Sequence, residues 1–231
     1  MEQPGTSRLT EAVQELASQV VSALRSGDHF VAFRGVTGQA GDEDLALAAT
    51  RVLGADAMLP ALLPGRSAAP DDLAAFEKAV LGFPPAPDAA PTTRWSHWAM
   101  ARTLTRLGGL AADPAGPPQP DAAWLGGAPW QYLTHQLAVL GALALPGSPS
   151  AVAAAAAERP LDVARGFVRA VRRRDWLQAA AAGRWLVLLD GVPDTLGLDA
   201  GLEFVGQMGG TDARVLMHLE AARLLREGEP R

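Results

Sequence analysis

The most unusual local cluster of side chains that could bind or react is the short segment Arg94-Trp95-Ser96-His97-Trp98. On a helix Arg94 and Trp98 are four residues apart and lie on the same side. Two indoles, a guanidinium and an imidazole so close together could line a pocket for a flat or anionic ligand. We therefore predict Arg94, Trp95 and Trp98 as ligand-binding residues and His97 as a catalytic candidate. The alternative is that an indole anchors the core and His97 lies at its edge.

A second aromatic group contains Trp124, Trp130, Tyr132 and His135. Tyr132 and His135 are three residues apart, so a helix would place them side by side. Imidazole titrates near neutral pH, which makes His135 a candidate general base. We predict Trp130 and Tyr132 as ligand-binding residues. The alternative is the polar side of an ordinary amphipathic helix.

Both groups follow Pro-rich segments, and the chain between them is long enough to set their helices side by side. This arrangement suggests one shared cavity that offers indole faces to an apolar or aromatic ligand. Arg94, His97 and His135 would then be its polar contacts. The hypothesis requires His97 and His135 to lie on the same side of the molecule.

A basic stripe is formed by Arg165, Arg169, Arg172 and Arg173, which recur at helical spacing. Such a stripe can hold a phosphate, a nucleotide or the acidic surface of a partner such as an acyl carrier protein. Residues 151–231 contain as many Asp and Glu as Arg, and Arg is favoured near a helix C-terminus by the dipole. An acidic protein partner and a simple solvated face are therefore the two interpretations.

Catalytic signatures are otherwise missing from the sequence. It has no glycine-rich phosphate loop, no Gly-x-Ser-x-Gly elbow, no His-Glu-x-x-His and no Glu-x-x-His pair. The absence of Cys excludes disulfides, thiolate nucleophiles and iron–sulfur clusters. We expect no metal and no cofactor. Glu203, in an apolar segment, is the remaining catalytic candidate, since a buried carboxylate would need an Arg partner or have a raised pKa.

Composition is that of a packed globular protein, with 231 residues of which 48% are hydrophobic and 19% charged. The net charge of −5 argues against nucleic acid or an anionic membrane as partner. Arg greatly outnumbers Lys, which is typical of a GC-rich bacterial genome. The N-terminus lacks a signal peptide, and the most apolar stretch, 133–145, is shorter than the roughly 20 residues that span a bilayer. We expect a soluble cytoplasmic protein.

Helical periodicity extends over nearly the whole chain, as in the stripe Leu9, Val13, Leu16, Val20 and Leu24. The expected fold is all-α, a compact array of about ten short antiparallel helices, with two helical layers as one arrangement. A helical-hairpin solenoid is the alternative. The segment 29–33, with weak strand character, is expected to be an extended connection. The expected helices cover about 6–26, 42–53, 55–63, 70–81, 92–107, 130–145, 161–174, 176–189 and 198–208. Two more are expected, a run of alanines capped by Ser148-Pro149 and a last helix capped by Thr211-Asp212.

Two Pro-rich stretches interrupt this pattern, at residues 82–91 and 113–120. Proline removes a backbone donor and restrains the preceding residue, so neither stretch continues a helix. We expect an N-terminal helical part over 1–82 and a C-terminal part over 92–231, joined by a linker at 83–91 into one cooperative domain. The second stretch is expected to be a mobile loop or lid.

Two functions are consistent with these features. The first is a small bacterial helical protein that binds or transforms an apolar or aromatic small molecule in an aromatic-lined cavity, accessory to specialised metabolism. The second is a non-enzymatic helical module that recognises a protein partner through the Arg stripe or an apolar groove. A cavity lined by Trp, with His and Arg pointing inward, would favour the first. Whether the protein is an enzyme stays open at this point.

Overall fold

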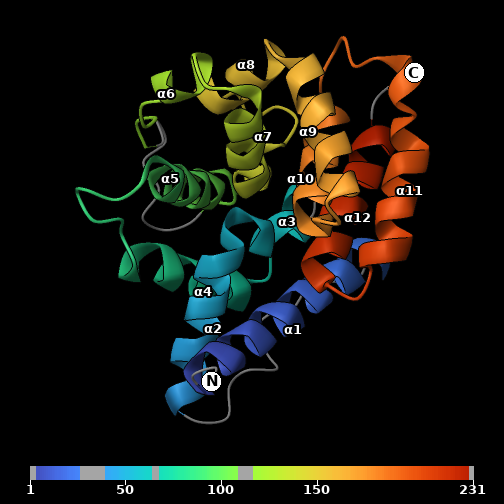
Figure 1. The fold of residues 1–231 in the computed structure, drawn as a ribbon. Helices are drawn as coiled ribbons and strands as arrows, with labels where there is room; N and C mark the ends of the chain where they lie inside the picture. The colour runs from blue at the N-terminus through green and yellow to red at the C-terminus, as the bar shows by residue number, and fades with distance from the viewer. Residues whose placement is uncertain (1–3, 27–39, 64–67, 109–116, 229–231) are drawn as a thin grey trace. The chain divides into compact units, whose positions relative to one another are not determined.

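The computed structural model describes residues 4–26, 40–63, 68–108 and 117–228, and the secondary structure in these ranges is helical without strands. The all-α prediction is confirmed. The chain divides into two compact units, Met1–Pro118 and Gln119–Arg231, whose helices are labelled in Figure 1. This division falls in the second Pro-rich stretch, whereas we expected a boundary at 83–91. The predicted extended segment 29–33 lies outside the described residues, as do residues 113–116 of the expected lid at 113–120.

Unit 1 contains five α-helices and one 3-10 helix within its described residues. They are α1 (Pro4–Ser26), α2 (Ala40–Leu53), η1 (Gly54–Met58), α3 (Leu59–Leu62), α4 (Pro70–Gly82) and α5 (Pro91–Arg106). Helix α1 packs on α2, η1 and α3, while α4 packs on both α2 and α5. The Pro-rich stretch 83–91 therefore connects two helices that pack against each other within one unit.

The buried stripe of α2 is shifted by one position along the sequence from the expected stripe. Helical spacing of apolar residues in this segment predicts a buried side made of Leu45, Ala48, Ala49 and Val52, but Val52 is exposed. The structure buries Ala46, Ala49, Thr50 and Leu53, because a shift of one residue turns a helix by about 100°. Leu81, also expected inside, is exposed in the last turn of α4.

The run Glu43–Leu62 is long and apolar enough to be a candidate membrane span, but 72% of its window is buried inside the fold. Core helices of soluble proteins have the same property. In this protein the run is broken at Gly54, whose φ of +64° is accessible to glycine at little cost. The short helix expected across 55–63 is present as η1 and α3.

Unit 2 contains the remaining helices of the described residues. They are α6 (Ala123–Gly126), α7 (Trp130–Val139), η2 (Gly141–Leu143), α8 (Ala151–Ala157), α9 (Pro160–Arg172), α10 (Trp176–Leu186), η3 (Asp194–Leu196), α11 (Leu198–Gly209) and α12 (Ala213–Glu227). The centre of the unit is α10, which packs against α7, α9, α11 and α12. The arrangement is that of a compact helical array, as expected.

Several helix boundaries follow from capping. Asp175 accepts a hydrogen bond from Gln178 N at the start of α10, and Asp212 accepts one from Arg214 N at the start of α12, as expected. The cap of α8 is Ser150, two residues after the expected Ser148. Helix α5 starts with Pro91 in its first turn and lacks the expected threonine cap.

Helix α7 ends at Val139, earlier than the expected 145, and continues after Leu140 as η2. At Gly141, the first residue of η2, the chain lies close to the imidazole of His218 on α12, since an added Cβ would lie 2.9 Å from its Cε1.

The orientation of α9 is fixed by contacts on its inner side and at its first turn. Gly166 packs directly on Thr134 of α7. The Arg159 guanidinium donates to the Ala128 carbonyl at 2.8 Å and to the Asp162 carboxylate at 2.6 Å. Because the inner residues Val163, Phe167 and Ala170 are buried, the opposite side of α9 faces solvent.

Replacing Gly166 with Ala tests the packing that positions α9. The new Cβ would lie 2.4 Å from the Cβ of Thr134, which no side-chain rotation can move away. We expect Gly166→Ala to lower the free energy of unfolding by about 1–3 kcal/mol, measured by urea denaturation. Gly126→Ala is the control, because nothing lies within 4 Å of its added Cβ. Equal stability of the two variants would contradict the close α7–α9 packing.

Candidate functional site

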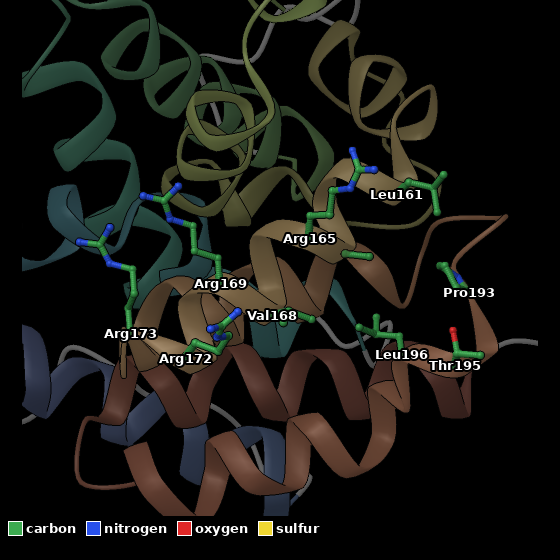
Figure 2. Close-up of a pocket in the computed structure, with 10 residues that line it drawn as sticks. Leu161, Arg165, Val168, Arg169, Arg172, Arg173, Pro193, Thr195 and Leu196 are labelled. Carbon is green, nitrogen blue, oxygen red and sulfur yellow. The ribbon is translucent and has the colours of Figure 1, made fainter.

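The outer side of α9 and the segment around η3 enclose an open groove of about 670 Å³ (Figure 2). All of its lining residues belong to unit 2. The lining consists of Leu161, Ala164, Arg165, Val168, Arg169, Arg172, Arg173, Pro193, Thr195 and Leu196. The groove therefore combines the whole predicted Arg stripe with an aliphatic floor.

The electrostatics of this groove are strongly one-sided. Its lining includes four guanidinium groups and no carboxylate. Leu161 and Val168 are exposed despite being aliphatic, so apolar surface is available between the charges. A protein with a formal net charge of −5 thus carries a local cationic and apolar surface.

The four arginines differ in how they are held. Arg169 lies over the indole ring of Trp130 on α7, with its guanidinium carbon 5.7 Å from the ring centroid. This cation–π contact restrains the guanidinium and leaves its edge available for hydrogen bonding. Arg165 is paired with Asp162 at 3.1 Å. Within the described residues, Arg172 and Arg173 have no carboxylate within salt-bridge distance.

Sequence reasoning identified the arginines of this site and missed its aliphatic half. Leu161 and Val168 follow the helical spacing of the Arg stripe, and this was the signal that could have identified them. Pro193, Thr195 and Leu196 have no such local signal. They reach the groove through the connection from α10 to α11, where Gly191 and Gly197 adopt positive φ.

The predicted aromatic turn in unit 1 is built as core. Trp95 and Trp98 are buried and form an edge-to-face pair with centroids 5.1 Å apart. The indole N–H of Trp98 donates to the Pro117 carbonyl at 2.9 Å. Arg94 is exposed and donates to the Ala89 carbonyl at 2.9 Å. These contacts match the structural alternative for this turn.

His97 is half-buried and its Nε2 donates to the Val80 carbonyl at 3.1 Å. Burial lowers the pKa of His97, the hydrogen bond to Val80 raises it, and the nearby Arg51 guanidinium lowers it again. The net result is a pKa below the ordinary 6.5. The same burial lowers the pKa of Arg51, which donates to Ser96 Oγ at 3.4 Å.

The candidates in unit 2 lie mostly at the surface. Tyr132 and His135 are exposed; the Tyr132 ring packs edge-to-face on Trp124, and His135 Nδ1 is 3.2 Å from Gln178 Oε1. Glu203 is also exposed and accepts a hydrogen bond from Gln207 at 3.2 Å. The idea of a buried Glu203 is wrong, because the side of α11 that carries it faces solvent.

The shared-cavity hypothesis stays a prediction. Its first set of residues, around Trp98, belongs to unit 1, and its second set, around Trp130, belongs to unit 2. Each set is explained by contacts inside its own unit. In the part of the chain that the structure describes, no three His, Asp or Glu side chains gather as a metal site would need.

Comparison with known proteins adds no identification. No family model, no curated protein and no solved structure matches this chain. The function must therefore be argued from the groove itself.

The lowered pKa of His97 predicts a pH dependence of stability. Because the unfolded chain binds a proton at His97 more readily than the folded protein, this residue's contribution to stability is complete above about pH 6.5 and is lost as the pH falls below it. We expect the free energy of unfolding of the wild type to decrease more between about pH 7.5 and about pH 5 than that of His97→Gln. Glutamine keeps an N–H donor for Val80 and does not titrate. Parallel pH profiles of the two proteins would contradict this assignment.

Proposed function

We propose that unit 2 is a protein-interaction module and that the α9 groove binds an acidic segment of a partner protein. One observation carries the proposal: four arginines and an aliphatic floor line a single open groove that has no carboxylate in its lining. Guanidinium groups form bidentate hydrogen bonds with carboxylates, and such pairs are stronger than neutral hydrogen bonds. An acidic segment is thus the natural complement of this surface.

The dimensions of the groove suit a segment of secondary structure. From Leu161 to Arg173 the helix rises about 18 Å, at 1.5 Å per residue. A partner helix or extended strand of this length could place apolar side chains on Leu161 and Val168 and carboxylates on the arginines. Because the charges stand at the surface, they would speed association and select the partner more than they would add affinity.

The open shape favours a macromolecule over a small ligand. Small-molecule sites usually enclose most of the ligand surface and are rich in aromatic side chains. The lining of the α9 groove contains no Trp and no His. The hypothesis of an aromatic small-molecule cavity stays a prediction, as do the cytoplasmic location, the bacterial source and the link to specialised metabolism.

Charge reversal in the groove tests the proposal. The probe is a fluorescein-labelled helical peptide of about 16 residues, long enough to cover the groove at 1.5 Å per residue, with leucines on one face and glutamates beside them. We expect saturable binding to the wild type by fluorescence anisotropy. Arg172→Glu/Arg173→Glu should bind at least about tenfold more weakly, which corresponds to about 1.4 kcal/mol. Added salt should weaken binding to the wild type.

Arg174→Glu is the matched control for single reversals, because Arg174 directly follows Arg173, is exposed and does not line the groove. We expect Arg173→Glu to weaken binding clearly more than Arg174→Glu, while thermal melts show that both variants stay folded. Absence of saturable binding to the wild type, or equal losses in the two variants, would refute the proposal. Displacement of the peptide by inorganic phosphate at low concentration would replace it with a small-anion site.

A further inference from the structure

The two ends of the α9 groove differ in their chemistry. Figure 2 shows Arg169, Arg172 and Arg173 toward one end, and Leu161, Pro193 and Leu196 toward the other. The lining residues at the start of α9 and in η3 are mainly apolar, whereas those in its last two turns are mainly cationic. The groove is therefore polarised along the helix axis.

Ion pairing increases this polarity. Arg165, the arginine nearest to the apolar end, shares the Asp162 carboxylate with Arg159, at 3.1 Å and 2.6 Å respectively. That carboxylate offsets part of the positive charge of these two arginines near Leu161. Arg172 and Arg173 have no carboxylate within salt-bridge distance among the described residues, so uncompensated positive charge is concentrated at the C-terminal end of α9.

Arg169 stands where the apolar and cationic parts meet. Its guanidinium is restrained by the Trp130 ring at 5.7 Å, so it is more ordered than a freely solvated arginine. Less conformational entropy is lost when a restrained guanidinium pairs with a carboxylate. The cationic end of the groove therefore begins at an arginine whose position is restrained.

We propose that the groove binds its partner segment in one orientation, with the acidic end on Arg169, Arg172 and Arg173 and the apolar end between Leu161 and Leu196. This inference rests on the proposed function and adds the order of chemistry along the partner. A partner in the reversed orientation would place its carboxylates near Asp162 and its apolar side chains under unpaired guanidinium groups. Like charges and desolvated, unpaired charges both penalise that orientation.

The order of residues in the partner can therefore be tested with two peptides of identical composition. One has glutamates in its N-terminal half and leucines in its C-terminal half, and the other has the reverse order. Each carries a nitroxide at its glutamate end and is added to the ¹⁵N-labelled full chain. We expect both peptides to broaden the amide signals of Arg172 and Arg173 much more than those of Leu161 and Leu196, because the acidic end decides the orientation. A nitroxide at the leucine end should reverse the pattern.

A pair of variants tests the apolar end independently. Leu161→Glu places a carboxylate where the partner's apolar end should lie, and we expect it to weaken peptide binding at least about fivefold, or about 1 kcal/mol. Val139→Glu on α7 is the control, because Val139 is an aliphatic residue of nearly equal exposure, 55% against 54%, outside the groove lining. We expect binding to Val139→Glu to stay within about twofold of the wild type.

The outcomes separate this inference from the proposed function. Equal broadening at both ends of α9, with binding still lost in Arg172→Glu/Arg173→Glu, would overturn the single orientation and leave the acidic-segment function standing. Wild-type binding to neither peptide would overturn both. Equal effects of Leu161→Glu and Val139→Glu would also overturn the assignment of the apolar end.

Discussion

Close approach of helices to α10 is the constraint on which unit 2 depends. Residues 179–183 of this helix are four alanines and a glycine, all buried, so that neighbouring backbones come near on every side. An added Cβ at Gly183 would lie 2.4 Å from Leu202 of α11. Two buried polar side chains of α10 are hydrogen-bonded in the core: Trp185 donates to the Leu137 carbonyl at 2.7 Å, and Arg184 donates to that of Ala144 at 3.2 Å. A larger residue in this run would force the surrounding helices apart.

The groove depends on this packing through α9. Small residues let α9 lie against both α10 and α7, and Arg159 holds its first turn to carbonyls in α6 and just after it. Once the inner side is fixed, the arginines and the exposed Leu161 and Val168 project from a rigid element. Side chains on a rigid helix keep their mutual spacing, which would favour recognition of the proposed partner segment. Unit 1 buries Trp95 and Trp98 in its own core.

Much of the secondary structure followed from local chemistry. Caps such as Asp175 and Asp212 and breakers such as Pro160 act within one turn, so the sequence shows them directly. Predictions of helix ends and buried faces failed where contacts with residues distant in the sequence determine the structure. The buried stripe of α2, which packs on α1 and α4, is shifted by one residue from the expected one, and α7 ends just before Gly141, where the chain lies close to His218. The ligand-binding role expected of the Arg94–Trp98 turn stays a prediction, since residue type cannot distinguish a buried indole from one that lines a pocket.

By itself, the sequence determined the all-α class and the presence of four arginines on one side of a helix, because both depend on periodicity along a single segment. It could not determine whether that side faces solvent, a core or a ligand. Only the tertiary structure brought Pro193, Thr195 and Leu196 opposite α9, which turned a stripe into a groove. It also placed Trp130 of α7 under Arg169 of α9, although the two residues are 39 positions apart in the chain. Such contacts arise from packing between elements, and no local pattern encodes them.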